Sequence, residues 1–216
     1  MKASMIGGDV QYVSQSTSKY SHVDTIKLAI EGGCRWIQLR MKDEPKEEVL
    51  KTALVVQQIC RDAGATFIID DYVDIVKTIH ADGVHLGNND MPIAQARKIL
   101  GNDFIIGGTA NNLNTIISHY HDGADYVGLG PYRFTTTKKN LSKILGIDGV
   151  KNISEGMQRE GINIPIVVIG GITSNDIADI MKYNMYGIAI SGIVANANNP
   201  AVEMKKLINE IKKWKN

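Results

Sequence analysis

Short apolar runs alternate along this chain with longer amphipathic segments, and loops rich in Gly, Asp and Asn separate them. Short runs rich in β-branched residues are typical of buried strands, whereas apolar positions that recur every three or four residues are typical of helices. The predicted strands are Gln11–Ser14, Trp36–Leu39, Thr66–Ile69, Gly83–Leu86, Phe104–Ile106, Tyr126–Gly128, Ile166–Ile169 and Gly187–Ile190. The clearest helical patterns are Glu47–Ala63, Ile93–Leu100, Leu113–His121 and Ala201–Trp214.

This alternation predicts an α/β fold with parallel strands and right-handed crossovers. Eight such units within 216 residues favour a single-domain (β/α)₈ TIM barrel over residues 1–216, with a doubly wound open sheet as the alternative. Asn112 and Ser174 are predicted N-caps of the helices that follow them. In either architecture ligands bind at the carboxyl ends of the strands, so candidate site residues belong there.

The amino-acid composition limits the kinds of molecule that the protein is expected to bind. Hydrophobic residues make up 44% and charged residues 22%, which is typical of a globular protein. A formal net charge of +1 gives no electrostatic case for nucleic acid or a membrane surface. Cys34 and Cys60 are predicted to be free thiols, and without an apolar run of signal or membrane-spanning length the expected location is the cytoplasm. Small-molecule substrates are the expected partners, and a homodimer stays open.

The second predicted strand ends in polar residues. Side chains alternate between the faces of a strand, so Gln38, Arg40 and Lys42 project on one side. A core strand does not normally present two cationic side chains inward, and the guanidinium of Arg can form bidentate hydrogen bonds with phosphate oxygens. These residues therefore predict an anion site, against the alternative that Arg40 and Lys42 begin a solvated loop.

Acidic residues end the third strand and follow the fourth. Asp71 and Asp90 would share one mouth of the barrel with no obvious Lys partner, and a cation between them would relieve their repulsion. Mg²⁺ held by one or two carboxylates and by substrate phosphate oxygens is the usual solution. The alternative is that these acids cap helices or form Asx-turns. We interpret His85, inside the fourth strand, as a hydrogen-bonded core histidine rather than a ligand or a base.

Hydroxyl groups gather after the fifth and sixth strands. The predicted fifth strand leads into Gly107-Gly108-Thr109, and a loop of about fifteen residues with Thr135, Thr136, Thr137 and Lys138 follows the sixth. A loop of this length in a compact domain is often functional, and its hydroxyls and ammonium suit an anion. The alternative is a flexible polar loop without function.

Glycines follow the seventh and eighth strands at the position where barrels commonly bind phosphate. Gly171, Ser191 and Gly192 can bring backbone N–H groups close to an anion there. Together with the site around strands two to four, this predicts a substrate set with two phosphate-bearing groups.

Four motifs resemble those of the thiamine-phosphate synthase family, in its order and at its spacings, over essentially the whole chain. The loop of the form Gly-Pro, three residues, Thr-x-Thr-Lys is the most specific of them. The motifs are Gln38-Leu39-Arg40-Met41-Lys42, Asp82-Gly83-Val84-His85-Leu86-Gly87, Gly130-Pro131 through Thr135-Thr136-Thr137-Lys138, and Ile169-Gly170-Gly171-Ile172.

The resemblance implies a role for each matching residue. A hydroxymethylpyrimidine pyrophosphate would lie against Gln38, Leu39, Arg40, Met41, Lys42, Asp70 and Thr109, with Asp71 and Asp90 binding Mg²⁺. Thr135, Thr136 and Thr137 would belong to the substrate site, Lys138 would reach the pyrophosphate, and Gly171, Ser191 and Gly192 would receive the thiazole phosphate. Arg40, Lys42 and Lys138 are the implied catalytic residues.

On this resemblance, the chain would be a transferase that joins the pyrimidine pyrophosphate to a thiazole phosphate and releases pyrophosphate. Three residues depart from the family's pattern: Asp70 stands for the usual Asn, Tyr72 for a frequent Arg, and Thr109 for Ser. Two alternatives stay open, a thiazole tautomerase-like isomerase on the same barrel and a non-catalytic sensor of thiamine precursors.

Overall fold

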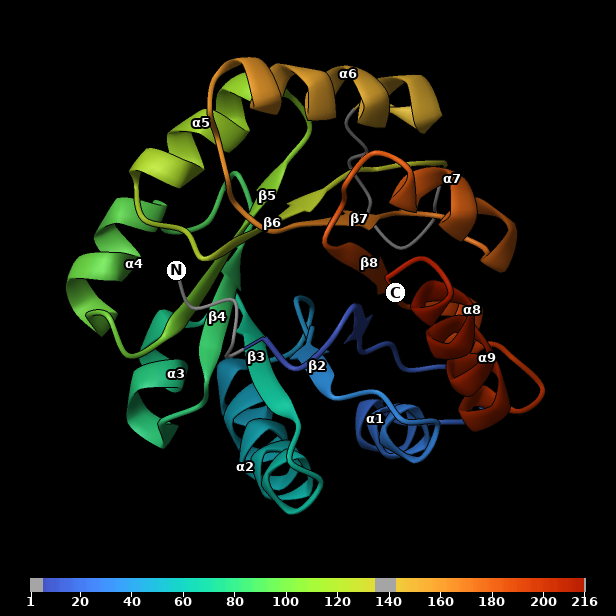
Figure 1. Cartoon of the computed structure of the whole chain (residues 1–216). Coiled ribbons are helices and arrows are strands. Elements are labelled where there is room, and N and C mark those ends of the chain that lie inside the picture. Colours follow the sequence, from blue (N-terminus) through green and yellow to red (C-terminus); the bar gives the residue numbers. More distant parts are fainter. Residues whose placement is uncertain (1–5, 135–142, 216) are drawn as a thin grey trace.

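Eight parallel strands close into a barrel in the order of the sequence, and helices surround it (Figure 1). The computed structural model describes residues 6–134 and 143–215. Pairing of β1 with β8 closes the barrel, which confirms the predicted (β/α)₈ fold and excludes the open sheet. The strands are β1 (Val10–Val13), β2 (Trp36–Leu39), β3 (Thr66–Asp70), β4 (Gly83–Leu86), β5 (Ile105–Ala110), β6 (Tyr126–Leu129), β7 (Ile166–Ile169) and β8 (Gly187–Ile190).

The helices of the described residues follow the predicted periodicity closely. The predicted Ile93–Leu100 and Leu113–His121 match α4 and α5, and the other two predicted segments are shifted by only one or two residues at their ends. The helices are α1 (His22–Glu31), α2 (Lys46–Asp62), α3 (Val73–Ile79), α4 (Ile93–Leu100), α5 (Leu113–His121), α6 (Gly146–Arg159), α7 (Ile177–Met181), α8 (Gly192–Ala195) and α9 (Pro200–Lys212).

One of the two predicted caps is correct. The side chain of Asn112 accepts a hydrogen bond from the N–H of Thr115 and caps α5. The prediction for Ser174 is wrong, because Thr173 caps the 3₁₀ turn Ser174–Asp176 before α7. Thr173 and Asp176 form a reciprocal capping box, which satisfies two backbone N–H groups at once and therefore fixes the start one residue earlier.

The barrel interior is apolar toward one end and polar toward the other. Trp36 on β2 and Tyr126 on β6 belong to a buried apolar cluster, and their rings meet edge to face with centroids 4.9 Å apart. Buried polar side chains lie further along the strands, among them Gln38, Asp70 and His85. This polar layer faces the carboxyl ends of the strands, where sites in this fold occur.

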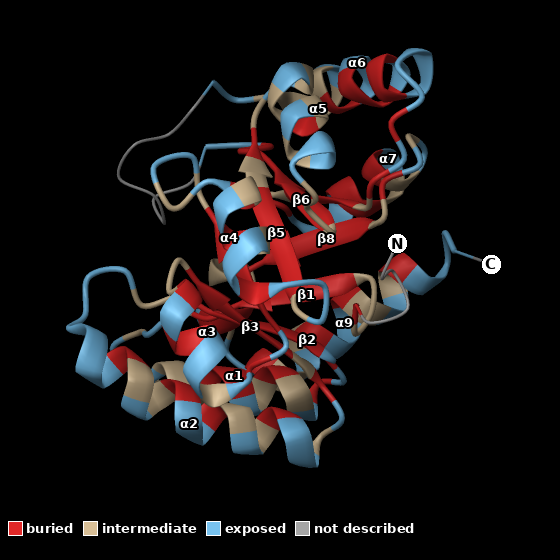
Figure 2. Ribbon diagram, turned by 90° about the vertical axis from the view of Figure 1, so that its left-hand side faces the viewer, coloured by how far each residue is buried: buried red, intermediate tan, exposed pale blue. Residues whose placement is uncertain are grey.

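A second, larger apolar cluster fills the layer between the barrel and the helices. Figure 2 shows the result: the strands are buried and the helices expose their outer faces. Within residues 6–134 and 143–215, no helix combines the length and apolar character needed to cross a membrane.

Candidate functional site

Side chains from the end of β2 meet a buried carboxylate at the end of β3. Asp70 is only 4% exposed; one of its oxygens accepts a hydrogen bond from the Gln38 amide, and the other lies 3.4 Å from Arg40 Nε. The backbone N–H of Arg40 donates to Ser14 Oγ at 3.0 Å, which fixes the chain where it leaves β2. The prediction that Gln38 and Arg40 point to one face is confirmed, and Arg40 contacts the site instead of solvent alone.

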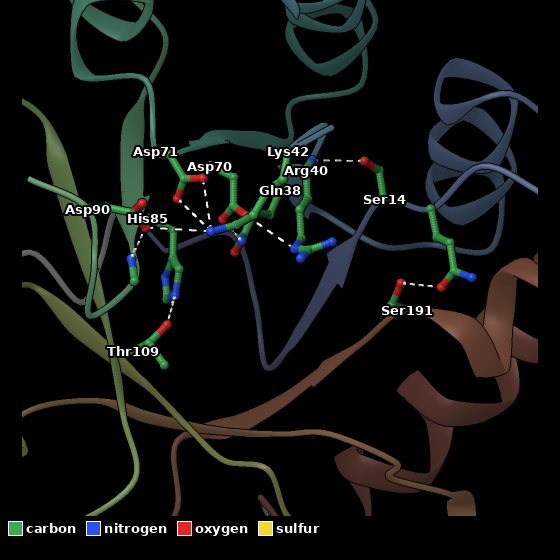
Figure 3. Close-up of polar contacts among 12 residues, drawn as sticks. Ser14, Gln38, Arg40, Lys42, Asp70, Asp71, His85, Asp90, Thr109 and Ser191 are labelled. Atoms are coloured by element: carbon green, nitrogen blue, oxygen red, sulfur yellow. Dashed lines mark hydrogen bonds and ion pairs between the residues drawn. The ribbon is translucent and has the colours of Figure 1, made fainter. Parts of the chain in front are cut away.

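Lys42 lies between the two predicted metal-binding carboxylates (Figure 3). Its Nζ is 2.9 Å from Asp71 Oδ2 and 3.5 Å from Asp90 Oδ2. Asp71 and Asp90 therefore converge over one mouth, as predicted from their places after neighbouring strands. The expectation that they have no Lys partner is wrong, because the loop after β2 brings Lys42 back between them. This pairing could not be read from residues that are 29 and 48 positions apart.

Local backbone geometry sets the orientation of the Asp71 and Asp90 carboxylates. Asp71 adopts a left-handed conformation with φ of 67°, an unusual conformation that Asp tolerates better than most residues. Its N–H donates to the carbonyl of His85 at 2.9 Å, so the chain turns directly at the end of β3. The carboxylate of Asp90 accepts from the N–H of Gly87 at 2.7 Å. A Cβ at Gly87 would lie at the same 2.7 Å from Asp90 Oδ2, which explains the glycine.

The two carboxylates differ in proton affinity. Burial, followed by the nearby Asp70 carboxylate, raises the pKa of Asp71 to about 7. Burial also acts on Asp90, but hydrogen bonds with Asp71 and with the Gly87 N–H outweigh it and lower the pKa of Asp90. Burial opposes the charge of Lys42 as well, yet the three carboxylates around it raise its pKa. The pair therefore holds a proton near neutral pH that a divalent cation could replace.

Leu39 and Met41 alternate with the polar residues of the same segment and pack into the layer between barrel and helices. Leu39 is 1% exposed and Met41 is partly buried. Side chains on this face point away from Gln38 and Arg40. A substrate contact by Leu39, as the resemblance implies, would therefore involve its backbone.

Thr109 is the second-last residue of β5 and contacts a histidine of the neighbouring strand. Its Oγ1 is 3.0 Å from His85 Nε2, and His85 Nδ1 is 3.0 Å from the hydroxyl of Tyr126. His85 is 9% exposed, and its interpretation as a hydrogen-bonded core histidine is confirmed. The Thr109 hydroxyl is half-buried at the mouth, where the sequence placed it.

The second predicted anion site lies after β7 and β8. Ile169 on β7 pairs with Ala189 on β8. Gly171 lies two residues after Ile169 and Ser191 two residues after Ala189, so both lie just beyond the ends of neighbouring strands. Gly171 has φ of 66°, and its carbonyl accepts from Arg133 Nη1 at 3.0 Å. Ser191 donates to Gln15 Oε1 at 3.1 Å and immediately precedes α8, which begins at Gly192. In Figure 3, Ser191 lies apart from the Lys42 cluster, so the mouth has two polar regions.

Comparisons with known proteins bear on this geometry. A family model described as "Thiamine monophosphate synthase" matches residues 10–194. The chain belongs to the thiamine monophosphate synthase family. A thiamine-phosphate synthase of Phocaeicola vulgatus is 54% identical over 93% of this chain and 97% of the relative. One of Bacteroides thetaiotaomicron is 48% identical over 93% of this chain and 96% of the relative.

A solved structure agrees with the sequence relatives. The thiamine phosphate pyrophosphorylase of Pyrococcus furiosus superposes with a TM-score of 0.85 at 30% identity, covering 97% of this chain and 98% of that one. As a member of the thiamine monophosphate synthase family, the chain is a transferase of thiamine biosynthesis. The enzyme class predicted from the motifs is confirmed.

Asp70, which the resemblance compares with a family Asn, is accommodated by its neighbours. An extra carboxylate beside a pyrophosphate site would cost electrostatic energy if it were unpaired. Here Gln38 donates to one oxygen of Asp70 and Arg40 lies against the other, so side chains of the protein itself stabilise the negative charge of Asp70. Tyr72, in place of the frequent Arg, packs against the apolar layer at the start of α3.

Several residues that organise the family's long loop escaped the sequence analysis. Asn111 donates to the carbonyl of Gly130 at 2.9 Å and to that of Lys143 at 2.8 Å, and so holds the two ends of the loop together. Arg133 donates two hydrogen bonds to Asp176, of 2.9 and 2.7 Å. Both contacts join residues far apart in sequence, so no local pattern could indicate them. The predicted Thr135, Thr136, Thr137 and Lys138 lie outside the described residues.

Proposed function

We propose that this enzyme joins 4-amino-2-methyl-5-hydroxymethylpyrimidine pyrophosphate to a thiazole phosphate, giving thiamine phosphate and pyrophosphate. The bond between the pyrimidine methylene carbon and the pyrophosphate oxygen breaks, and its electron pair leaves with the pyrophosphate. The thiazole nitrogen then donates its lone pair to the same carbon. The convergence of Asp71 and Asp90 on Lys42, with Arg40 close by, is the observation that carries the proposal.

The donor set at this mouth fits Mg²⁺. Asp71 and Asp90 would hold the ion, and both offer the oxygen ligands that it prefers. In the described part of the chain, no three His, Cys, Asp or Glu residues form a complete metal cage. Substrate phosphate oxygens would supply further ligands. When bound, Mg²⁺ supplies positive charge to the pyrophosphate oxygens.

The protein's own cations face the same region. Arg40 and Lys42 would donate to pyrophosphate oxygens, and a donor that is fixed before reaction stabilises the negative charge growing on the leaving group. Gln38 would contact the pyrimidine, and Lys138 would add a further ammonium. Gly171, Ser191 and Gly192, on the other side of the mouth, would receive the thiazole phosphate. Two anchored phosphate groups would hold both rings at attack distance.

No protein nucleophile is needed if the pyrimidine carbon–oxygen bond breaks before the thiazole attacks. The pyrimidine amino group can stabilise the benzyl-like cation that results. The buried cysteines agree with this route: burial raises the pKa of the Cys34 thiol to about 11 and that of Cys60 to about 12, so neither is a thiolate at neutral pH.

The test is an assay of pyrophosphate release and thiamine phosphate formation with both substrates and Mg²⁺. Asp71→Asn should raise the Mg²⁺ requirement sharply. The matched control is Asp74→Asn, which removes an exposed carboxylate paired with Lys46 outside the cluster. Interconversion of thiazole phosphate tautomers without pyrophosphate release would instead indicate an isomerase. Calorimetric binding of both substrates without turnover would indicate a sensor.

A further inference from the structure

A line of hydrogen bonds crosses the barrel interior and ends at the mouth. Gln11 on β1 donates from Nε2 to the hydroxyl of Tyr126 on β6, at 3.0 Å. The same hydroxyl lies 3.0 Å from Nδ1 of His85 on β4, and His85 Nε2 lies 3.0 Å from Oγ1 of Thr109 on β5. The four residues come from four different strands. Figure 3 shows the last of these contacts, from His85 to Thr109.

The direction of each bond follows from the first. Gln11 Nε2 can only donate, so the oxygen of Tyr126 accepts there. Among the described residues, the Tyr126 hydroxyl has two side-chain partners, and its own proton therefore goes to His85 Nδ1. If Nδ1 carried a proton instead, two donors would meet at Tyr126 and its buried hydroxyl proton would lose its acceptor, at a considerable cost.

Because Nδ1 accepts, the ring proton of His85 is on Nε2, which donates to Thr109. Because the Thr109 oxygen accepts from His85, the hydroxyl keeps its own proton to donate elsewhere. Burial raises the pKa of Tyr126 far above its usual range, so this tyrosine stays protonated and the line keeps its direction.

Neighbouring residues leave space for this line and hold its end in place. A Cβ at Gly107 would lie 2.2 Å from Cζ of Tyr126, so only glycine leaves room for the ring. On the outer side of β5, His119 Nε2 lies 2.9 Å from the carbonyl of Thr109 and anchors the backbone. Gln11 and Tyr126 are each at most 1% exposed, so water does not compete for their hydrogen bonds.

We propose that Tyr126 and His85 are positioning residues that fix the Thr109 hydroxyl as a hydrogen-bond donor to the departing pyrophosphate. This rests on the proposed function. A free hydroxyl rotates and must be ordered at the moment of reaction, whereas one that already accepts from His85 points its proton along a restricted set of directions. Preorganised donors of this kind stabilise charge that develops in the transition state.

Kinetics provide the first test, through a double-mutant cycle. Thr109→Val should lower kcat by about 10- to 100-fold, because it removes a hydrogen bond to a charged group. Tyr126→Phe should lower kcat by only about fivefold, because that hydrogen bond remains and only its orientation is lost. In the Thr109→Val background, Tyr126→Phe should have almost no further effect. Thr109→Ser should retain the sensitivity to Tyr126→Phe. Tyr120→Phe, at an exposed site on α5, is the matched control and should leave kcat unchanged.

A second readout does not depend on activity. The ¹⁵N shifts of His85 in the wild-type protein, assigned by comparison with His85→Asn, should report the neutral Nε2–H tautomer. A Nδ1–H tautomer would reverse both hydrogen bonds of His85, to Tyr126 and to Thr109, and would overturn the proposal even if Tyr126→Phe fails to fold. Equal kcat losses from Tyr126→Phe in the Thr109 and Thr109→Val backgrounds would also overturn it. Absence of pyrophosphate release by the wild type would refute the proposed function instead, leaving the tautomer to decide the direction of the line.

Discussion

Mg²⁺ binding to the substrate-free enzyme should depend steeply on pH, because Asp71 has a raised pKa. The metal needs the ionised carboxylate. With the pKa of Asp71 at about 7, only about one tenth of the protein has this carboxylate ionised at pH 6, and about nine tenths at pH 8. The apparent affinity should therefore rise about tenfold from pH 6 to pH 8 and change little above it. At pH 7, binding should release about half a proton per Mg²⁺.

Calorimetric Mg²⁺ titrations at pH 6, 7 and 8 measure the affinity, and titrations in buffers of different ionisation enthalpy measure the released protons. Asp71→Asn should bind the metal weakly and with little pH dependence, since Asn cannot ionise. Asp74→Asn, whose carboxylate lies on α3 outside the cluster, should behave as the wild type. The same affinity at pH 6 and pH 8, with no proton release, would refute the argument that Asp71 shares its proton with Asp90 and loses it to the metal.

Three further predictions concern single substitutions. Lys138→Ala should lower kcat at least about tenfold in the pyrophosphate-release assay, and unchanged turnover would remove its assigned role. Asp71→Asn should raise the melting temperature of the metal-free protein at pH 8 but not at pH 4, because a raised folded-state pKa costs stability as pH rises from 3.8 to about 7. Gly171→Ala should cost about 1–2 kcal/mol in urea denaturation, since φ is 66° and the new Cβ would lie 2.9 Å from the Phe134 carbonyl; a loss below the error of the fit would contradict this.

The sequence by itself predicted the barrel and most residues of the candidate site. Seven of the eight strands lie where short apolar runs predicted them, within a residue or so, because burial on both faces demands such runs. β5 is the exception: the predicted strand ended at Ile106, but the observed one continues to Ala110. Gly107 and Gly108 lay beyond the predicted range, whereas in the fold they continue the strand and leave room for Tyr126 and His119. Local pattern cannot tell a glycine that turns the chain from one that accommodates a ring.

Only the tertiary structure decided which of the predicted polar residues contact one another. Strand order placed Asp71 and Asp90 at one mouth, but the insertion of Lys42 between them depends on the path of a loop. Likewise, Gln11 and Tyr126 are 115 residues apart, and their hydrogen bond exists because the barrel closes. The periodicity of apolar residues indicates which side chains are buried, because apolar side chains are more stable away from water. The partner of a buried polar group is set by three-dimensional packing, which no stretch of sequence contains.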